Sequence, residues 1–517
     1  MFTKVFPALS SSSEQLLKMM RRNFNALHNS PFDLLVIGGG IYGAWTAYDA
    51  ALRGLKVALV EKNDWGSGTS QSSSKLIHGG LRYLKYGWFG LVHKSLQERK
   101  RLLKLAPHRI FPLRFLLPVY EDSGMNRLTL KIGLSLYDVI AGGDSGLHKH
   151  HSVSKEEILK TLPFLSEKKL LGGFEFFDAQ TDDARCTLEI VYGALQSNAV
   201  CVNHSEAITL LRANNRVCGA LVKDLETDQT LEIQSKITVN TAGPWCQTIL
   251  KKGEAENKKV RLTKGTHLVM PLLSKDRAIL LSTRFDRRVF FLLPWYGTTL
   301  LGTTDTDYYG NPDGLCVGAE EIAYLLAEAN HYLGLHWKKT DVISSFTGLR
   351  ALKNIPGKSP SSISREWVLE ESEKNLLLSL GGKFTSARMD ATQIVNRALE
   401  ILGIPVKNQP TKDRPFPWCP DGNFKGWKQQ KIQEGCSLGL DTETANNACH
   451  RFGSTVDHLF SLIRNERTLA NRIVPEHPFC QGEIKHAALH EMARTPEDTF
   501  RRRIPLAILD KAKWVGG

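Results

Sequence analysis

A chain of 517 residues is too long for one ordinary hydrophobic core, so two or three domains are expected. Its 42% hydrophobic and 23% charged residues are typical of a soluble globular protein, and Pro294 and Gly297 break its longest apolar run, residues 289–301, which excludes a membrane-spanning helix of roughly 20 residues. The 67 lysines and arginines exceed the 53 acidic residues and leave a formal net charge of +14, which favours anionic partners such as nucleic acid, phosphate ligands or acidic lipid.

The first 30 residues carry a basic, amphipathic pattern. Four basic residues stand against a single acid there, and residues 16–27 (LLKMMRRNFNAL) place their apolar side chains roughly on one face at helical spacing. Two interpretations stay open. The segment is either a membrane-surface helix or transit-peptide-like leader, or it is an extension that packs its apolar face on the folded protein.

The next segment has the pattern of a strand, a glycine turn, a helix and a second strand. Residues 33–38 (DLLVIG) form a short aliphatic run that ends at glycine, residues 44–53 have helical character, and residues 55–62 (LKVALVEK) predict another strand. Together these elements predict a βαβ unit.

The glycine turn of this unit reads GGGIYG, a G-x-G-x-x-G pattern from Gly38 to Gly43. The first glycine permits the tight turn, Gly40 lets the backbone approach a pyrophosphate, and Gly43 allows the helix to pack closely on the strand. Glu61 ends the second strand eighteen residues after Gly43, where a carboxylate accepts hydrogen bonds from an adenosine ribose. The segment therefore predicts a site for an unphosphorylated dinucleotide.

Helices and then strands are predicted through the middle of the chain. Helical patterns cover residues 91–105, 128–140 and 155–162, with a proline-rich extended segment at 107–120. β-rich runs follow at about 260–305, and they predict a second sheet in a substrate domain.

Strands related to the first sheet recur late in the chain, at 236–240 (KITVN) and 376–380 (LLLSL). The dinucleotide domain is therefore expected to be discontinuous in sequence. After Leu402 a proline-bearing linker leads to a polar, helix-like tail that ends in Arg501–Arg503, and this tail predicts a third, helical domain.

The nine cysteines are scattered, form no CxxC pair and follow no signal peptide. This distribution favours free thiols in a reducing compartment over a zinc or iron–sulfur site. No bound metal is predicted.

Two features favour FAD over NAD as the dinucleotide. After Glu61 the chain continues as a glycine- and serine-rich loop, residues 64–76, instead of another βαβ repeat. The strand at 236–240 then closes with residues 241–245 (TAGPW). At this point the sequence resembles the FAD-binding family that includes D-amino-acid oxidase, glycine oxidase and glycerol-3-phosphate dehydrogenase.

Further blocks, in the same order along the chain, resemble FAD-dependent glycerol-3-phosphate dehydrogenase. They cover most of residues 32–400 and reappear in the tail. The blocks are SSKLIHGGLRYL (73–84), LAPH (105–108), DAQTDDAR (178–185), NTAGPW (240–245), KGTHLVMP (264–271), FFLLPW (290–295), LGTTDTDY (301–308), TGLRAL (347–352), SR (364–365), LGGKFT (380–385) and EMARTPEDTFRRR (491–503).

The resemblance implies an α/β (α+β) chain. A Rossmann-like FAD-binding domain, discontinuous in sequence, is expected beside a β-sheet substrate domain and a C-terminal helical domain. The expected boundaries are 1–30 for the N-terminal extension, 31–90, 171–260 and 340–400 for the FAD-binding domain, 91–170 and 261–339 for the substrate-binding or cap domain, and 405–517 for the helical domain.

A small phosphorylated alcohol needs a cationic cradle, and a guanidinium suits it because its forked donors match phosphate oxygens. Arg82, Arg350 and Lys383 are the candidates, since each lies beside glycine or small residues in an otherwise apolar segment. Thr303, Thr304 and Asp305 follow a hydrophobic strand, and they either orient the substrate or the base, or cap a turn. The predicted substrate-binding residues are Arg82, Tyr83, Thr303, Thr304 and Arg365.

Oxidation of a secondary alcohol also needs a base for the hydroxyl proton, and histidine is the natural base near neutral pH. The resemblance implies that His267 of KGTH faces the substrate, while the IHGG setting of His78, the alternative, fits a residue that supports the flavin loop. His267, Arg350 and Lys383 are the predicted catalytic residues, and which of them accepts the proton stays open. Lys383 is expected near the N1 edge of the flavin or the substrate phosphate.

The resemblance also implies which residues contact FAD. They lie in the glycine turn, at the end of the second strand, in the serine loop, and in the TAGPW and GGKFT blocks. They are Gly38, Gly40, Ile41, Tyr42, Gly43, Glu61, Lys62, Thr69, Ser70, Ser73, Ser74, Lys75, Leu76, Ala242, Gly243, Trp245, Gly381, Gly382, Lys383, Phe384 and Thr385.

The implied reaction is oxidation of sn-glycerol 3-phosphate to dihydroxyacetone phosphate, by hydride transfer from C2 to flavin N5, with electrons passed to a membrane quinone. The implied partners are glycerol 3-phosphate, the quinone and an anionic membrane surface to which the protein attaches peripherally, with no nucleic acid; a homodimer is compatible with this scheme. The implied location is the cytoplasmic face of a bacterial cell membrane or the mitochondrial inner membrane of a eukaryote.

Two alternatives stay open at this stage. One is an FAD-dependent amine or amino-acid oxidase of the same fold, and the other is a basic nucleic-acid- or lipid-binding protein with a vestigial dinucleotide fold. The chain also departs from the family pattern at Ala351, where a proline commonly follows the arginine, and at Ala387, where a tyrosine is common. The long insertion of the oxidase relatives is not evident, which favours a dehydrogenase.

Overall fold

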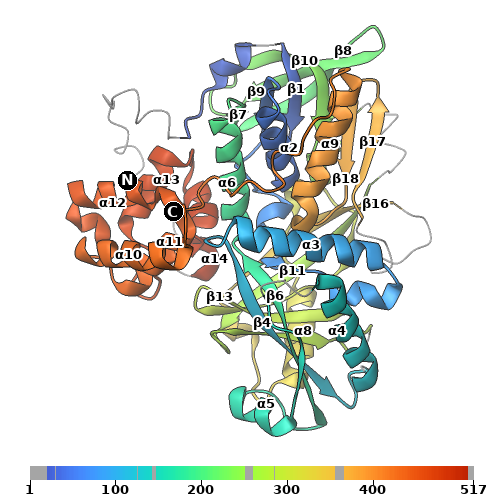
Figure 1. Ribbon diagram of the computed structural model, residues 1–517, viewed down its shortest axis with the longest axis vertical. Coiled ribbons are helices and arrows are strands. Elements are labelled where there is room, and N and C mark those ends of the chain that lie inside the picture. The colour runs from blue at the N-terminus through green and yellow to red at the C-terminus, as the bar shows by residue number, and fades with distance from the viewer. Residues whose placement is uncertain are drawn as a thin grey trace.

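The computed structural model describes residues 20–29, 31–124, 126–142, 147–250, 260–284, 286–354 and 366–510. Figure 1 shows two β-sheets with helices packed on them, and a group of C-terminal helices to one side. The predicted α/β (α+β) class, with a sheet-based substrate domain and a C-terminal helical domain, is confirmed.

The first sheet holds the predicted βαβ unit. Its strand order is β17-β18-β10-β1-β2-β7, and β8 and β9 extend it from β10. The pairs that join β18, β10, β1, β2 and β7 are all parallel. The strands are β1 (Phe32–Ile37), β2 (Val57–Val60), β7 (Val200–Val202), β8 (Ser205–Ala213), β9 (Arg216–Asp224), β10 (Thr230–Asn240), β17 (Val368–Glu373) and β18 (Leu376–Leu380).

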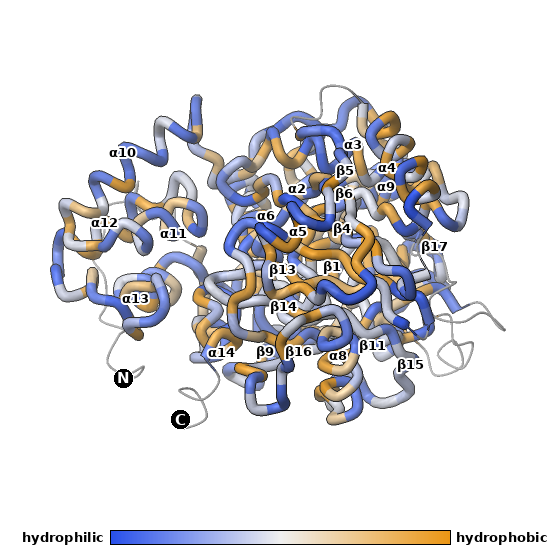
Figure 2. Tube along the Cα trace, turned by 90° about the horizontal axis from the view of Figure 1, so that it is seen from below, coloured by the Kyte–Doolittle hydropathy of each residue, from blue (hydrophilic) through white to orange (hydrophobic). Residues whose placement is uncertain are grey.

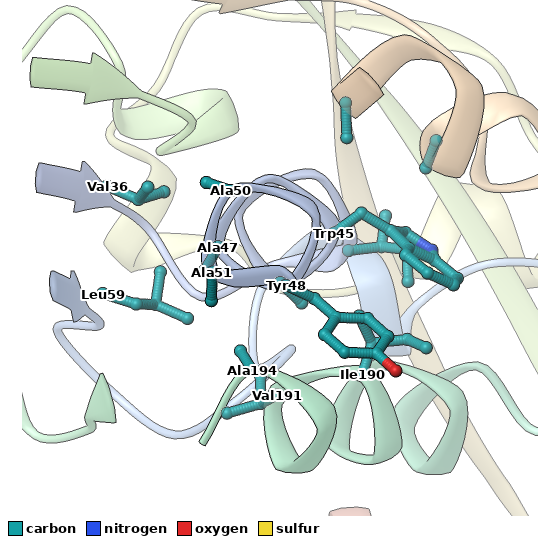
Figure 3. Packing of buried hydrophobic residues seen from close by; sticks show 14 of the residues in the cluster. Val36, Trp45, Ala47, Tyr48, Ala50, Ala51, Leu59, Ile190, Val191 and Ala194 are labelled. Atoms are coloured by element: carbon teal, nitrogen blue, oxygen red, sulfur yellow. The ribbon is translucent and has the colours of Figure 1, made fainter. Parts of the chain in front are cut away.

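The central strands of this sheet are aliphatic on both sides, so both faces are buried: helices cover one face, and residues 24–27 with β8 and β9 pack on the other. Helix α2 (Ile41–Leu52) packs on β1 and β2, and it lies between helices α6 (Asp183–Gln196) and α9 (Ala387–Ile401), which pack on the same face of the sheet. Figure 3 shows alanines of α2 beside Val36 and Leu59 of the strands, with Tyr48 reaching toward α6. Small side chains on α2 let the helix approach the strands closely, and this places the start of α2 at the carboxyl end of β1.

The second sheet has ten strands in the order β15-β11-β14-β13-β12-β4-β6-β3, with β16 on β11 and β5 on β6. Three of its strands, β3, β6 and β16, come from ranges that were predicted for the FAD-binding domain. Residue patterns predict a strand but not the sheet that it joins. The strands are β3 (Leu76–Ile77), β4 (Ile110–Tyr120), β5 (His151–Val153), β6 (Leu170–Thr181), β11 (Val260–Pro271), β12 (Arg277–Ser282), β13 (Val289–Trp295), β14 (Thr298–Gly302), β15 (Thr306–Tyr308) and β16 (Ser344–Lys353).

Four helices accompany the second sheet. They are α3 (Phe89–Leu105), α4 (Arg127–Ala141), α5 (Lys155–Thr161) and α8 (Ala319–Tyr332). The first three agree with the predicted helices to within two residues at each end. The proline-rich segment between α3 and α4 forms the extended strand β4.

The C-terminal helices build a small core of their own, which includes Phe452, Leu459 and Ile463. They are α10 (Phe424–Ser437), α11 (Thr442–Phe452), α12 (Val456–Asn465), α13 (Gln481–His490) and α14 (Leu506–Leu509), and a π-helical turn covers Asp498–Arg503. In Figures 1 and 2 helices α10 to α13 form a lobe beside the two sheets. Buried ion pairs join the lobe to the sheets, for example Arg185 of α6 with Glu491 at 2.6 Å.

The described part of the N-terminal segment packs on the folded protein. Met20, Phe24 and Leu27 are buried, and Arg22 forms an ion pair of 2.6 Å with Asp224. Residues 20–29 therefore match the packed-extension interpretation, whereas residues 1–19 lie outside the described chain. Within the described residues, no helix combines the length and the hydrophobicity needed to cross a membrane.

Candidate active site

One cavity of about 530 Å³ is lined by residues of both sheets. Two parts of its wall differ in character. We call the part formed by Gly38, residues 40–42, Glu61 and residues 241–245 the glycine end, and the part that carries Arg82, His267, Arg350 and Lys383 the basic wall.

Backbone atoms crowd together at the glycine end. Gly38 has a φ of +104°, which a side chain would strain, and a Cβ atom there would lie 2.8 Å from the Cα atom of Ala242. A Cβ atom at Gly43 would overlap the carbonyl oxygen of Gly38, so only glycine lets α2 begin this close to β1. The start of α2 therefore presents bare backbone to the cavity, as an anionic group at a helix N-terminus requires.

Glu61 ties this turn to the end of β2. Its carboxylate accepts hydrogen bonds from the backbone N–H groups of Gly39 at 2.6 Å and Asn63 at 2.9 Å. Burial raises the pKa of Glu61, although these two hydrogen bonds oppose the rise. The carboxylate lines the cavity, where it offers acceptor oxygens to hydroxyl groups of a ligand.

The serine loop after Glu61 connects several parts of the wall. Ser70 Oγ accepts a hydrogen bond of 2.9 Å from the N–H group of Ile41, the first residue of α2, and Thr69 Oγ1 donates to the carbonyl of Leu349 in β16. Ser74 Oγ lies 2.9 Å from Nε2 of His267. The loop thus reaches from the glycine end to the basic wall.

Lys75 belongs to this loop but turns away from the cavity. Its side chain is buried and pairs with Asp183 of α6 at 2.6 Å, and its Nζ atom lies over the rings of Trp295 and Phe346. The carboxylate of Asp183 also accepts a hydrogen bond of 2.7 Å from Ser73. Lys75 was predicted to contact the cofactor, but in this structure it braces the serine loop from behind.

His267 lies in β11, opposite Gly302 of β14 and Phe346 of β16. Its ring stacks on Phe346 with centroids 5.0 Å apart, and only 2% of the residue is exposed. Burial, and then the charges of Arg350 and Lys75, lower the pKa of His267 to about 3. The imidazole is therefore neutral at physiological pH and has a nitrogen lone pair to accept a proton.

Arg350 is held by the loop that follows β14. Its guanidinium donates to Asp305 Oδ1 at 3.1 Å and to Thr303 Oγ1 at 3.2 Å. Asp305 is thus the partner of Arg350, a role that the sequence left open among substrate, base and turn. Thr304 points elsewhere, since its hydroxyl accepts from the N–H group of Thr266 and donates to Glu321.

Lys383 follows two glycines, and its Nζ atom lies 3.9 Å from the ring centroid of Tyr83. The guanidinium carbon of Arg82 lies 5.0 Å from the centroid of the same ring. Tyr83 is buried, and both cations contact its ring. Tyr42 of α2 fixes the turn behind them by accepting a hydrogen bond of 3.0 Å from the N–H group of Lys383.

Most of the predicted site residues meet in this cavity. Gly43, Lys75 and Thr304 do not line it, and Arg365 lies outside the described residues. The residues that do line it are Gly38, Gly40, Ile41, Tyr42, Glu61, Lys62, Thr69, Ser70, Ser73, Ser74, Leu76, Arg82, Tyr83, Ala242, Gly243, Trp245, His267, Thr303, Arg350, Gly381, Gly382, Lys383, Phe384 and Thr385.

Some residues of the cavity wall were not predicted from the sequence. Five of the apolar side chains that line the cavity belong to the second sheet and were not predicted: Phe115, Phe176, Leu280, Val289 and Phe291. They come from strands β4, β6, β12 and β13, whose alternating patterns predict a buried face without saying what that face meets. Asp313 also escaped notice, although it accepts a hydrogen bond of 2.8 Å from Trp245 at the rim.

Comparison with family models identifies two segments. Residues 33–386 match the model described as FAD dependent oxidoreductase. Residues 419–515 match the model described as C-terminal domain of alpha-glycerophosphate oxidase. The two matches correspond to the two-sheet body and to the helical lobe.

Curated relatives extend over nearly the whole chain. The glycerol-3-phosphate dehydrogenase of Synechocystis sp. is 33% identical and covers 94% of this chain and 91% of its own length. The aerobic glycerol-3-phosphate dehydrogenase of Staphylococcus saprophyticus is 34% identical, with 92% and 87% covered. The mitochondrial glycerol-3-phosphate dehydrogenase of Arabidopsis thaliana is 33% identical, with 94% and 81% covered.

Two solved structures agree with these relatives. The glycerol-3-phosphate dehydrogenase of Bacillus halodurans, solved in complex with FAD, superimposes with a TM-score of 0.77 at 29% identity and covers 95% of this chain and 89% of its own. The L-alpha-glycerophosphate oxidase of Mycoplasma pneumoniae, with FAD bound, has a TM-score of 0.56 at 18% identity and covers 74% of this chain and 97% of its own. The second likeness concerns the fold alone.

Proposed function

This chain belongs to the FAD dependent oxidoreductase family, and within that family we propose that it oxidises sn-glycerol 3-phosphate to dihydroxyacetone phosphate and passes the electrons to a membrane quinone. One observation carries the proposal. A buried, neutral histidine and three cationic side chains line the same cavity as a dinucleotide-type glycine turn. A phosphorylated secondary alcohol needs these groups, because one end of it is anionic and the other must lose a proton.

The residues of the cavity fit FAD. Gly38 and Gly40 and the start of α2 would hold the pyrophosphate, since a side chain at Gly38 would fill the approach. Glu61 would accept the ribose hydroxyls, and the hydroxyl groups of the serine loop supply further donors. FAD, when bound, supplies the two-electron acceptor for hydride from the substrate carbon.

His267 is the group that we assign to the hydroxyl proton. Oxidation of a CH–OH carbon to a ketone releases a hydride and a proton, and the neutral imidazole accepts the proton. Ser74, 2.9 Å from Nε2, orients the ring. Burial and then the positive charge of Arg350 lower the pKa of His267, and a bound phosphate would offset that charge, so substrate binding itself would make the ring a stronger base.

Arg350, Arg82 and Lys383 form the proposed phosphate cradle. Asp305 and Thr303 hold the guanidinium of Arg350 in one orientation, so its remaining N–H groups have a fixed direction. Tyr83 contacts both Arg82 and Lys383 through cation–π interactions with its ring, which helps to hold the two cations in place. A preorganised cradle of this kind favours a dianionic phosphate over a carboxylate, which supports glycerol 3-phosphate over an amino acid as substrate.

A surface near the cavity supports attachment to a membrane. Leu128, Ile132 and Val139 of α4 are 67%, 61% and 75% exposed, and Tyr86 and Phe89 are exposed on the neighbouring segment that leads into α3. The exposed cations Lys85, Arg127 and Lys131 accompany these side chains. Apolar side chains beside cations suit the interface of an anionic bilayer, where a quinone is available.

Anaerobic flavin bleaching tests the reaction. Purified holoprotein is mixed with glycerol 3-phosphate, glycine or sarcosine without oxygen, and the flavin absorbance is followed. We expect bleaching by glycerol 3-phosphate alone. Bleaching by an amine alone would replace the proposed activity with that of an amine oxidase.

Vesicle flotation tests the membrane surface. We expect the protein to float with anionic vesicles and not with zwitterionic ones, and Ile132→Asp to abolish flotation. Ile404→Asp, at an exposed apolar residue of the interdomain linker, is the matched control and should float like the parent protein. If the Ile132→Asp variant floated with anionic vesicles as well as the parent protein does, the assignment of this surface would be contradicted.

A further inference from the structure

The RRR motif at residues 501–503 lies at the end of the C-terminal lobe, and neither the fold nor the reaction has so far given it a role. Two of its side chains reach Asp64, which lies more than 430 residues earlier. Arg502 Nε donates to Asp64 Oδ2 at 2.5 Å, and Arg503 donates from both of its terminal nitrogens, one of them to Oδ1 at 2.9 Å. Asp64 is the third residue after Glu61, at the glycine end of the cavity.

This contact is completely enclosed. Asp64 is 0% exposed, and Arg502 and Arg503 are 5% and 1% exposed. Burial would raise the pKa of Asp64, but the charges of Arg503 and Arg502 hold it below its ordinary value. The carboxylate is therefore ionised and fully engaged, and removal of Arg502 would take away one of the two guanidinium groups that compensate its buried charge.

The loop that carries Asp64 is fastened to the glycine turn. The N–H group of Gly66 donates to the carbonyl of Gly39 at 3.0 Å, and the ring of Trp65 packs against Gly39 so closely that a Cβ atom there would clash with it. Glu61 accepts from Gly39 at the same turn. A displacement of Asp64 would therefore be transmitted to the turn and to Glu61.

The charges of Asp64 and Arg502 also act on Glu61. The negative charge of Asp64 raises the pKa of Glu61, and the positive charge of Arg502 lowers it. An ionised Glu61 is the better acceptor for ribose hydroxyls. Arg502 thus favours the protonation state that the cofactor needs.

The acidic groups around the arginines form one neutralised cluster. Asp498 accepts a hydrogen bond of 2.6 Å from Arg502, and its carboxylate lies 2.9 Å from Nε2 of His204. Asp64, His204 and Asp498 lie close enough together to resemble a set of metal ligands. Arg502 and Arg503 already supply the positive charge at this place. The cluster is therefore best explained as an ionic clamp between the lobe and the loop.

We propose that Arg502 and Arg503 are positioning residues for FAD, which act through Asp64 and Glu61 on the adenosine part of the cofactor. The C-terminal lobe then completes the cofactor site without lining it. The inference rests on the FAD assignment but not on the substrate, so failure of glycerol 3-phosphate to bleach the flavin would leave it intact.

The test measures FAD affinity of reconstituted protein by quenching of flavin fluorescence, at pH 7.5 and at pH 5.5, together with thermal unfolding. We expect Arg502→Gln to weaken FAD binding at least tenfold, and more at the lower pH, because loss of the Arg502 charge adds to the effect of burial in raising the pKa of Glu61. Arg502→Lys should restore most of the affinity, since the charge remains.

Arg451→Gln is the matched control. Arg451 is 1% exposed and pairs with Glu483 inside the same lobe, away from Asp64. We expect it to lower the unfolding temperature like Arg502→Gln but to leave FAD affinity within twofold. An equal loss of affinity in both variants would overturn the proposal, because the lobe would then act only through general stability.

A comparison in double variants tests whether the charge of Arg502 acts through Glu61. In a Glu61→Gln background Arg502→Lys and Arg502→Gln should bind FAD equally, because the carboxylate through which the charge acts is gone. A difference between them that persists in this background would contradict the route through Glu61.

Discussion

The glycine end and the basic wall of the cavity are built in opposite ways. Backbone atoms make the glycine end, and most of them come from one continuous βαβ unit between residues 32 and 61. Side chains make the basic wall, and they come from four segments spread between Arg82 and Lys383. The glycine end requires glycines that have no Cβ atom, whereas the basic wall requires charged side chains that other residues hold in place.

This difference predicts how the two regions fail. A bulky substitution at the glycine end should remove the cofactor, whereas a substitution in the basic wall should remove activity from protein that still binds FAD. The predictions that follow test this separation.

The largest effect is expected for Gly43→Val. A Cβ atom at this position would overlap the carbonyl oxygen of Gly38 and lie 2.8 Å from Thr241 Oγ1, so α2 cannot keep its place on β1. We expect protein without FAD and with a markedly lower unfolding temperature. Gly133→Ala in α4 is the control, since its Cβ atom would meet nothing and should stabilise the helix by about 0.5–1 kcal/mol. Flavin absorbance and thermal unfolding measure both; a yellow Gly43→Val protein would refute the packing argument.

The second-largest effect is expected for His267→Gln. The amide retains a hydrogen bond to Ser74 but accepts no proton, so we expect kcat to fall by about 10²–10⁴ with the flavin content unchanged. His78→Gln is the control, because His78 also lines the cavity and is the alternative base. Steady-state assays decide between them, and a larger loss at His78 would move the base to that residue.

Arg350→Lys should have a smaller effect. Lysine keeps the positive charge but loses the fork that Asp305 and Thr303 orient, so we expect kcat/KM for glycerol 3-phosphate to fall about 10–100-fold, mostly through KM. The control is Arg288→Lys, which contacts the carbonyl of Asp305 at 2.8 Å from outside the cavity wall. An unchanged KM in Arg350→Lys would remove this residue from the cradle.

Glu61→Gln should change FAD affinity and little else. Loss of the charged acceptor is expected to weaken FAD about tenfold, as for one hydrogen bond to a charged group, while kcat at saturating FAD stays near the parent value. Glu206→Gln is the control, because Glu206 also lines the cavity but pairs with Lys62. Titration of apoprotein with FAD provides the measurement, and equal affinities would exclude Glu61 from the ribose site.

Lowering the pH should lower the free energy of unfolding, because His267 of the basic wall resists protonation in the folded protein. The unfolded chain protonates a histidine near its ordinary pKa, about 6.5, but folded His267 does so only at about 3, so the unfolded state binds more protons between these values and stability falls as the pH falls. We expect His267 alone to cost the apoprotein about 2 kcal/mol between pH 7 and pH 5. His267→Gln should remove that part of the pH dependence in urea unfolding, and an unchanged slope would contradict the depressed pKa.

The glycine end was largely predictable because its information is local. The strand, the turn glycines, the helix and Glu61 lie within about thirty residues, and hydrophobic periodicity and glycine spacing report on neighbours at that range. The predicted helices of residues 91–105, 128–140 and 155–162 were accurate for the same reason. Local patterns did not reveal that β6 and β16 join the second sheet.

The arrangement of the basic wall depended on contacts that no local pattern contains. Lys75 looked like a cofactor ligand, yet it turns to Asp183, 108 residues away, and Asp305 turned out to hold Arg350. Ion pairs of this kind form wherever folding brings opposite charges together, and the sequence alone does not say which partners meet.

By itself, then, the sequence determined the fold class, the dinucleotide turn and the residue types that the chemistry needs, because apolar periodicity and glycine spacing act over short distances. Only the tertiary structure decided which cations face the cavity, which carboxylate holds each of them, and that Arg502 and Arg503 close on Asp64 behind the glycine end. The reason is physical: a buried charge must find a partner, and the partner is chosen by the packing of distant segments.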